Sequence, residues 1–431
     1  MFDLIVSNAV LPDGRLGDIG IRAGRIEAIA PLAGQEAGER LDAGGHLVTP
    51  PFVDCHFHLD YALTAPLAPP NISGTLFEGI RNWRAIKDSL TEEGIYTRAR
   101  RLCEIAISQG TLAIRSHVDI GDPQLRGLRA LLRLREELRP WLAIQLVAFP
   151  QDGYFRRAGN DRQVARAVEM GVDVIGGIPH YERTTAQGDA SIRALFRLAA
   201  ERGLRVDMHC DENDDPQSRH VETMTACAVE YGLAGRVSAS HLTSMHSMPG
   251  PAADKIMSLL AETGVAAIAN PLVNMTLQGR FDTYPRRRGL MPVPEMIRAG
   301  VAVGFGHDCV MDPWYALGAH DMLDVASLAV HGVPMTGVDD IRSCWRAITD
   351  IGAQVLGLSD YGLAVGKPAD FVIVQAKSIV DAVRLRAPRL HVFRRGICIA
   401  ATPPAVRMLH LDRDSVLDPA GMWRDDALSR P

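Results

Sequence analysis

The sequence predicts an α/β fold: a closed (β/α)8 barrel of the TIM type, with a small β-sandwich domain formed from both ends of the chain. In the middle of the chain, short apolar strands alternate with helical stretches, and successive strand ends from the second onward lie roughly thirty to thirty-five residues apart. Both ends of the chain instead carry short strands of alternating polarity, separated by turns. The prediction depends on the contrast between these two patterns.

The terminal segments predict the small domain. The first fifty residues contain "DLIVSNAV", "GDIGIRAGRIEAIAP" and "HLVTP", with turns such as Pro-Asp-Gly between them. Far downstream, "DFVIVQAK" and "HVFRRGICIA" have the same character. Because neither piece alone has enough strands for a stable sheet, we expect the two to combine. The predicted boundaries are 1–50 plus 359–415 for the small domain, 51–358 for the barrel and 416–431 for a C-terminal tail.

The barrel strands are expected as nearly continuous apolar runs, which are typical of parallel sheets buried on both faces. We place them at residues 46–58, 111–119, 142–151, 172–180, 205–212, 236–241, 264–273 and 301–308. Between them, stretches such as "DASIRALFRLAAERG" (189–203) have apolar residues at helical spacing and end at a glycine. Eight such strand–helix units favour a closed barrel.

Length and charge limit the classes of function. The chain has 431 residues and is 47% hydrophobic, enough for a large core and a small second domain. Its net charge of −5 gives no electrostatic footprint for DNA or RNA, so we expect no nucleic-acid partner. The basic run Arg286-Arg287-Arg288 is the strongest counter-example, and we interpret it as a solvated or subunit-contact loop.

The sequence also predicts a cytoplasmic protein with no membrane association. The opening "MFDLIVSNAV" is a poor secretory signal, because an acid stands at position 3 and no basic run precedes the apolar residues. No window of about 18 uninterrupted apolar residues predicts a membrane span. Seven cysteines without a C-x-x-C pair favour reduced thiols over a disulfide framework.

Ionisable and polar residues recur at the ends of the apolar strands, where the active site of such a barrel lies. His56 and His58 share one face of the first strand. Later strand ends supply Gln151, His209, Glu212, His241 and Asp308. Unpaired polar groups would be costly there, so three histidines and an aspartate meeting at one rim predict a site for a divalent transition metal. A position left open for water would make that site catalytic.

Other histidines receive a plainer interpretation, because a single strand histidine is more often a structural residue than a ligand. We interpret five of them as supporting, capping or surface residues: His117, His180, His220, His246 and His307. If Asp308 points into the barrel, its neighbour His307 points away from the centre.

Long motifs follow these strands: "FVDCHFHLD", "VAFPQDG", "IPHYE", "MHCDENDDPQSR", "ASHLTSMHS", "ANPLVN", "LQGRFDTYPRRRG" and "GHDCVMDPWYALG". Together with "SGTLFEGI" at residues 73–80, they extend over nearly the whole chain. The pattern resembles the bacterial cytosine deaminases of the amidohydrolase superfamily. The small cytidine-deaminase fold is a different one, and its H-x-E and P-C-x-x-C zinc motif is absent from this chain.

The resemblance implies a role for each strand-end residue. It implies a single iron(II) or zinc ion held by His56, His58, His209 and Asp308, with Glu212 as proton shuttle and His241 holding the attacking water. It implies that Gln151 grips the amide edge of a pyrimidine, in a pocket shaped by Leu76, Phe149 and Trp314. It also suggests a homo-oligomer.

The expected chemistry follows from these residue types. A bound dication lowers the pKa of water enough to supply hydroxide near neutral pH. Asp308 would accept the proton of the water as general base, and hydroxide would attack C4 of the ring. Glu212, with a carboxyl pKa raised by burial, would protonate N3, and His241 would steady the hydroxide. Ammonia then leaves, protonated through Asp308, and a uracil-type product remains.

Cys309 departs from the family pattern, in which a second acid usually follows the aspartate. The resemblance places that acid near C5 of the ring. A thiol leaves a small, fairly apolar surface, on which a C5 methyl group would gain roughly 0.8 kcal/mol from burial. We therefore expect 5-methylcytosine as substrate, giving thymine, with cytosine and 5-fluorocytosine as further substrates. Neutral drift, with cytosine preferred, remains open; a nucleophilic thiolate is disfavoured beside Asp308.

Three alternatives remain beside this hypothesis. One is a deaminase of another amino-substituted heterocycle, such as creatinine or an aminotriazine. Another is a non-catalytic barrel that binds a nucleobase, against which Glu212 and His241 argue. The third, a hydrolase with two metals bridged by a lysine of the fourth strand, is disfavoured because "VDVIGGIPH" has no lysine.

Overall fold

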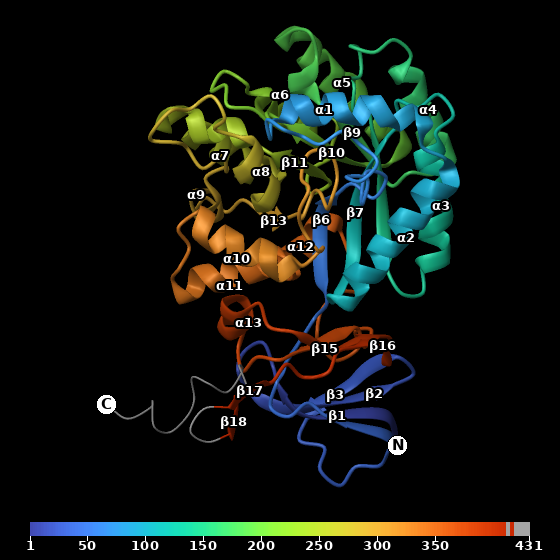
Figure 1. Ribbon diagram of the computed structural model, residues 1–431, viewed down its shortest axis with the longest axis vertical. Coiled ribbons are helices and arrows are strands. Elements are labelled where there is room, and N and C mark those ends of the chain that lie inside the picture. Colours follow the sequence, from blue (N-terminus) through green and yellow to red (C-terminus); the bar gives the residue numbers. More distant parts are fainter. Residues whose placement is uncertain (411–413, 418–431) are drawn as a thin grey trace.

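The computed structural model describes residues 1–410 and 414–417. Its centre is a parallel sheet whose eight strands follow one another in sequence order around a barrel (Figure 1). The strands are β6 (Phe52–Phe57), β7 (Thr111–Asp119), β8 (Ala143–Phe149), β9 (Val174–Gly177), β10 (Arg205–Cys210), β11 (Val237–His241), β12 (Ala266–Ala269) and β13 (Val303–Phe305). The predicted barrel is confirmed.

The barrel closes where the last strand meets the first. A parallel bridge pairs Phe57 with Asp308, and the backbone N–H of Asp308 donates to the carbonyl of His56 at 2.8 Å. The buried carboxylate of Asp54 accepts from the backbone N–H groups of His56 and His307, both at 3.1 Å. The closure therefore fixes the positions of candidate site residues directly.

Helices surround the barrel, each following a strand or a loop. They are α2 (Glu92–Ser108), α3 (Arg126–Leu138), α4 (Asn160–Met170), α5 (Thr185–Arg202), α6 (His220–Glu230), α7 (Gly250–Thr263), α8 (Pro271–Leu277), α9 (Val293–Arg298), α10 (Met322–Gly332), α11 (Val338–Ala347) and α12 (Asp350–Leu356). The predicted segment 189–203 falls in α5, which ends at Gly203 with a φ of 67°. Among the described residues, no helix has the length and apolar character needed to span a membrane.

A helix that the strand–helix rhythm did not predict lies between β6 and α2. Helix α1 (Leu76–Ile86) crosses the end of the barrel that is farthest from the small domain (Figure 1). Short 3-10 turns, η1 (Lys87–Ser89), η2 (Pro179–Tyr181) and η3 (Thr243–Ser247), follow α1, β9 and β11. Helix α1 and these three turns all lie where the chain leaves the carboxyl ends of the strands.

The small domain is one mixed sheet from both chain ends. Its strands are β1 (Phe2–Val10), β2 (Leu16–Arg22), β3 (Arg25–Ala30), β4 (Ala37–Asp42), β5 (Leu47–Thr49), β14 (Phe371–Val374), β15 (Arg389–Arg394) and β16 (Ile397–Ala401), with α13 (Ile379–Leu385) inserted. β1 pairs with β4 over most of its length and with β5 at Val10, so the sheet branches. Both branches bury side chains in one core, which confirms the predicted second domain.

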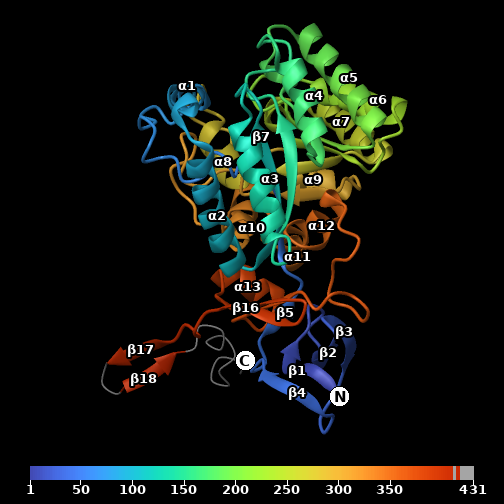
Figure 2. The same ribbon diagram turned by 90° about the vertical axis from the view of Figure 1, so that its right-hand side faces the viewer.

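Two details differ from the sequence expectation. Residues 46–58 form two strands, β5 in the small sheet and β6 in the barrel, because Pro50 and Pro51 lack the N–H groups that a continuous strand requires. A hairpin of β17 (Arg407–His410) and β18 (Asp414–Leu417) stands away from the body (Figure 2). The predicted tail, 416–431, thus begins inside β18, and residues 418–431 lie outside the described residues. The domain boundaries remain a proposal.

Candidate active site

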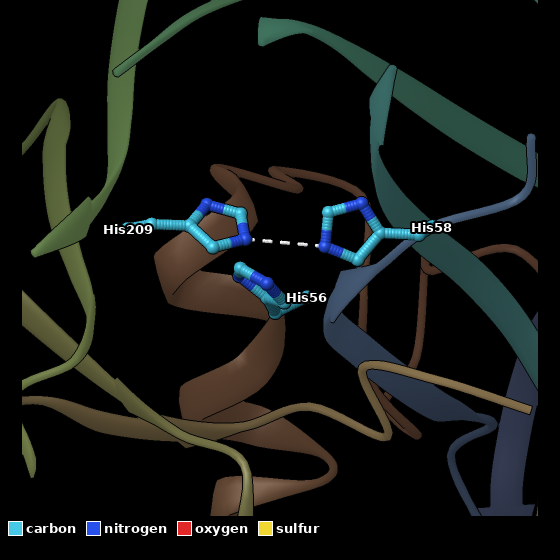
Figure 3. Close-up of side chains that lie close together, drawn as sticks. All are labelled: His56, His58 and His209. Carbon is cyan, nitrogen blue, oxygen red and sulfur yellow. Dashed lines mark hydrogen bonds between the residues drawn. The ribbon is translucent and has the colours of Figure 1, made fainter. Parts of the chain in front are cut away.

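Imidazoles from different strands converge at the carboxyl end of the barrel. His56 and His58 come from β6 and the residue after it, and His209 comes from β10 (Figure 3). The Nε2 atoms of His58 and His209 lie 3.1 Å apart. Oδ1 of Asp308 lies 3.5 Å from Nε2 of His56 and 3.5 Å from Nε2 of His58. The structure therefore brings all four predicted ligands together.

The geometry fits a metal ion. Ligand atoms about 2.0–2.2 Å from a tetrahedral ion lie about 3.3–3.5 Å from one another, close to the separations seen here. Nε2 of His56 has no hydrogen-bond partner in the described structure although it is buried. Burial lowers the pKa of His56, His58 and His209 well below the usual value, so each is a neutral imidazole with a lone pair. The cluster can hold a metal ion.

A polar chain beneath the cluster orients His56. The Ser240 hydroxyl donates to Oδ1 of Asp207 at 2.7 Å, so it must accept from Nδ1–H of His56 at 2.9 Å. This bond leaves the lone pair of His56 on Nε2, which faces the other ligands. Arg115 donates to the second oxygen of Asp207 at 2.7 Å, and both side chains are fully buried.

A second polar group beside the cluster combines Glu212 with His241. Oδ1 of Asn274 accepts a hydrogen bond from the backbone N–H of Asn270. The Nδ2 atom of Asn274 therefore donates to Nδ1 of His241, at 2.9 Å. His241 therefore carries its proton on Nε2 and can donate to an oxygen in the site. Burial, and secondarily Asp308, raise the pKa of Glu212 well above its usual value. Burial thus favours the protonated form of Glu212, which can give up a proton.

Part of the backbone strain of the chain lies in the same place. Asp211, His241 and Asp308 have φ values of 53°, 76° and 69°, a left-handed region that is unfavourable for residues with a Cβ. Such conformations persist where surrounding contacts impose them, typically at functional sites. Burial also raises the pKa of Asp308, which His241 partly offsets.

A cavity of about 280 Å³ opens beside the cluster. Its walls include most of the predicted site residues: His58, Leu76, Gln151, His209, Glu212, His241, Asp308, Cys309 and Trp314. His56 and Phe149 do not line it; Phe149 stacks against His209, with ring centroids 4.1 Å apart. Cys309 is buried, and its burial beside Asp308 raises the pKa of the thiol well above the usual value. It is therefore a neutral thiol.

The outer wall of this cavity consists of residues 75–80, around the start of α1, and residues 278–281. Helix α1 is anchored by Lys87, whose Nζ lies 3.1 Å from Asp119 and 2.8 Å from Asp152. Despite the opposing effect of burial, Lys87 and Arg84 lower the pKa of Asp152 to about 2. Asp119 is the last residue of β7 and Asp152 follows β8, so the helix is tied to strand ends.

Asp214 and His246 form a clasp on the other part of the outer wall. Asp214 accepts from the backbone N–H of Gly279 at 2.9 Å and from Nε2–H of His246 at 2.8 Å. Nδ1 of His246 accepts from the backbone N–H of Gly289 at 3.0 Å. One carboxylate–imidazole pair therefore holds both ends of the loop that carries Arg280 and Phe281 over the cavity.

The other histidines lie at different distances from the cavity: some are near it and others are away from it. His307 stacks on His320 at 5.4 Å, away from the cavity, and His220 bonds to Asp189 at 3.0 Å. His117 lies under the cluster, with its ring 4.1 Å from that of His56, and His180 lines the cavity. His246, interpreted from sequence as a supporting residue, is half of the clasp.

Sequence reasoning missed several supporting residues: Tyr61, Arg115, Asp207, Ser240 and Asn274. One signal was available, since Arg115 and Asp207 are charged residues inside otherwise apolar strands and need buried partners. None of the four lysines lines the cavity in the described structure, which agrees with the absence of a lysine from the fourth strand.

Comparison with known proteins defines the class. A model of the amidohydrolase family matches residues 39–402, so this chain belongs to that family. Two structures of 5-methylcytosine deaminase from Klebsiella pneumoniae, liganded with phosphonocytosine and with 5-fluorocytosine, are similar to it. They have 40% and 39% identity, TM-scores of 0.90, and coverage of 94% and 95% of this chain and 99% of theirs. The resemblance to cytosine deaminases is confirmed, and the chain is a hydrolase of this superfamily.

Two other proteins are also similar to this chain. N-isopropylammelide isopropyl amidohydrolase from Pseudomonas sp. (strain ADP) is 28% identical over 92% of this chain and 96% of its own. Pterin deaminase from Rhizobium rhizogenes is 30% identical over 91% of this chain and 90% of its own.

Proposed function

We propose that this chain deaminates a free pyrimidine base by metal-dependent hydrolysis, converting 5-methylcytosine to thymine and cytosine to uracil with release of ammonia. The observation that carries the proposal is Cys309, a neutral thiol on the cavity wall, at the position where the resemblance to cytosine deaminases implies a second acid. The 40% identity to a 5-methylcytosine deaminase supports the same substrate class.

The proposed metal is a single iron(II) or zinc ion, held by His56, His58, His209 and Asp308. Three neutral imidazoles and one carboxylate suit either ion. When bound, the ion supplies a water activated toward deprotonation near neutral pH. The hydrogen-bonded chain from His56 through Ser240 to Asp207 supports this assignment, because it turns a lone pair toward the other ligands.

In the proposed reaction the protein's own groups move the protons. Asp308 takes the proton of the attacking water and later delivers it to the departing amine. Glu212, held protonated by burial, donates to N3 as the ring loses its aromatic character. His241 donates from Nε2 to the attacking oxygen, since the Asn274 amide occupies Nδ1. Gln151 grips the amide edge, and Leu76, Phe149 and Trp314 shape the pocket around the ring.

Cys309 sets the preference at C5 in this proposal. A carboxylate at that position would lose its hydration to a methyl group, whereas a buried thiol accepts the methyl in apolar contact. Burial of the methyl contributes about 0.8 kcal/mol, and avoiding desolvation of an acid adds to it. Together these effects make 5-methylcytosine a better substrate than it would be with an acid at position 309.

A substrate panel tests the proposal. Ammonia release is measured from 5-methylcytosine, cytosine and 5-fluorocytosine, with creatinine, an aminotriazine and a pterin as the competing ring class. We expect 5-methylcytosine to be turned over at least as well as cytosine, and bound iron or zinc near one per chain. Cys309→Asp should lower kcat/KM for 5-methylcytosine about tenfold relative to cytosine, while the matched Cys309→Ser should not.

Three results would contradict it. Much slower turnover of 5-methylcytosine than of cytosine in the wild-type chain would remove the proposed role of Cys309. Turnover of a triazine or pterin in place of every pyrimidine would favour the other ring class, and no turnover of any ring would favour the non-catalytic barrel.

We also propose a homo-oligomer in the cytoplasm, with a free base as its small-molecule partner and no nucleic-acid or membrane partner. The seven cysteines form no disulfide, which supports a reducing compartment. The hairpin β17–β18, which stands away from the body, offers strand edges for contact with a second copy (Figure 2). Light scattering after size-exclusion chromatography measures the assembly state; a monomer at micromolar concentration would contradict it.

A further inference from the structure

Tyr61 occupies a central place in the cavity that its sequence context does not reveal. Its side chain is 1% exposed and lines the cavity. The ring stacks on that of His58, with centroids 4.6 Å apart and an interplanar angle of 7°, and on Trp314 at 4.9 Å and 29°. Tyr61 is thus held between a proposed metal ligand and the aromatic wall.

The hydroxyl of Tyr61 makes one hydrogen bond within the described residues. It donates to Oε1 of Gln151 at 2.7 Å, and no other hydrogen bond of this hydroxyl occurs in the described part of the chain. A free phenol has a pKa of about 10, so the Tyr61 hydroxyl keeps its proton near neutral pH and remains a donor.

This bond determines which way the Gln151 carboxamide faces. A carboxamide has one acceptor oxygen and one donor nitrogen, which could exchange places by rotation. With Oε1 turned toward Tyr61, Nε2 is left for the cavity, and among the described residues no group accepts from it. Gln151 therefore presents donors to a bound ring, and the free lone pair of Oε1 can accept a neighbouring ring N–H.

We propose that Tyr61 is a specificity-determining residue that sets the polarity of Gln151, so that the cavity selects rings with an oxo group at C2 and rejects rings with an amino group there. The inference rests on the proposed function and deepens it. A 2-oxo ring accepts from Nε2, whereas a 2-amino ring would turn its donors toward those of Gln151. One buried unpaired polar group of this kind reduces affinity about ten- to a hundredfold.

The test compares two substrates that differ in the C2 group and in the N1 proton that accompanies a 2-oxo group: 5-methylcytosine and 2,4-diamino-5-methylpyrimidine. Each takes water at C4 and releases ammonia, so one assay serves both. Tyr61→Phe keeps the stacked ring and removes the hydroxyl. We expect the preference for the 2-oxo substrate, as a ratio of kcat/KM, to fall at least tenfold, mostly through a higher KM for 5-methylcytosine.

The matched control is Tyr361→Phe. Its hydroxyl donates to the carbonyl of Pro51 at 2.6 Å, outside this cavity, so the variant loses a comparable bond away from the ring. The ratio for Tyr361→Phe should match the wild type. A ratio for Tyr61→Phe within twofold of the wild type would overturn the inference.

A binding measurement separates this inference from the proposed function. Calorimetry on zinc-loaded protein compares thymine with its 2-amino analogue, 5-methylisocytosine, and needs no turnover. Loss of the 2-oxo preference in Tyr61→Phe supports the role of Tyr61 even if no pyrimidine is deaminated, in which case the proposed reaction alone fails. Equal preference in both proteins overturns the role of Tyr61 even if the reaction is confirmed.

Discussion

The metal-ligand cluster and the outer wall of the cavity are built in different ways. The cluster comes from strand ends whose backbone is locked by the barrel, and His56 is oriented by the buried Ser240 and Asp207. The outer wall comes from α1 and the loop after α8, whose polar contacts with the barrel include the Lys87 ion pairs and the Asp214–His246 clasp. Its side chains Phe77 and Phe281 are 64% and 84% exposed.

This difference shows which part of the fold is suited to the reaction and which part is suited to admitting the substrate. Groups that share a metal must keep their separations within a few tenths of an ångström, which a closed sheet provides. A wall that admits substrate needs fewer fixed contacts, and a small number of polar anchors is enough to hold it. Changes in the cluster should therefore affect the reaction itself, whereas changes in the wall should affect access and affinity.

The largest effect is expected for a ligand of the cluster. His209→Ala should remove the bound metal and lower kcat by more than about a thousandfold, because a metal supplies several kcal/mol of transition-state stabilisation. Metal content by mass spectrometry and ammonia release measure the two losses together. His331→Gln, on α10 away from the cavity, is the control. Full activity without metal in His209→Ala would show that the cluster is not the reaction centre.

The next effect concerns the proton shuttle. Glu212→Gln keeps the shape of the side chain but cannot give up a proton, so kcat should fall about a hundred- to ten-thousandfold. KM and metal content should change little, because Glu212 is not one of the proposed ligands. Glu262→Gln, on the surface of α7, controls for the charge change. Unchanged turnover in Glu212→Gln would assign the proton to another group.

The same contrast explains what could be predicted from sequence. Parallel strands are nearly continuous apolar runs, so His56, His209, His241 and Asp308 stood out at their ends, and the barrel order placed them together. Helix α1 could not be placed, because local periodicity shows that it is helical but not which end of the barrel it covers. Tertiary contacts through Lys87, from far along the chain, decide that.

The supporting polar residues illustrate a second limit. Asp207 lies in a strand beside His209, and the sequence shows its charge but not that Arg115 lies 2.7 Å from it. The clasp is similar: His246 and Asp214 are 32 positions apart, and both meet a loop that lies still further along the chain. Pairings of this kind depend on how loops return over the barrel, which no short motif encodes.

A smaller effect is expected for the outer wall. His246→Ala should raise KM about three- to tenfold, because the 279–289 loop loses an anchor worth about one or two hydrogen bonds, with a smaller change in kcat. His246→Asn retains an acceptor for Gly289, and His246→Gln retains a donor for Asp214, so each should recover part of the affinity. If kcat falls a hundredfold while KM stays constant, the wall takes part in the reaction and the contrast with the cluster fails.

The smallest expected effect is a pH-dependent change in stability, and it concerns Asp312 in the segment that carries Trp314. Burial raises the pKa of Asp312 to about 7, against 3.8 for the free group, so the folded chain binds a proton that the unfolded chain releases. Wild-type stability contributed by this group therefore falls as pH rises from about 4 to 7. Asp312→Asn keeps Oδ1 to accept from the backbone N–H groups of Trp314 and Tyr315 and has no such loss.

The stability of Asp312→Asn relative to the wild type should accordingly increase by about 1 kcal/mol between pH 6 and pH 8, since one pKa unit corresponds to 1.36 kcal/mol. For a chain of this length the thermal midpoint should move by about 1 °C. Scanning fluorimetry of metal-loaded protein at the two pH values measures it, with the exposed Asp254→Asn as control. An equal gain at the two pH values would mean that Asp312 is already ionised in the fold at pH 6, held by charge pairing as Asp152 is and not neutral through burial.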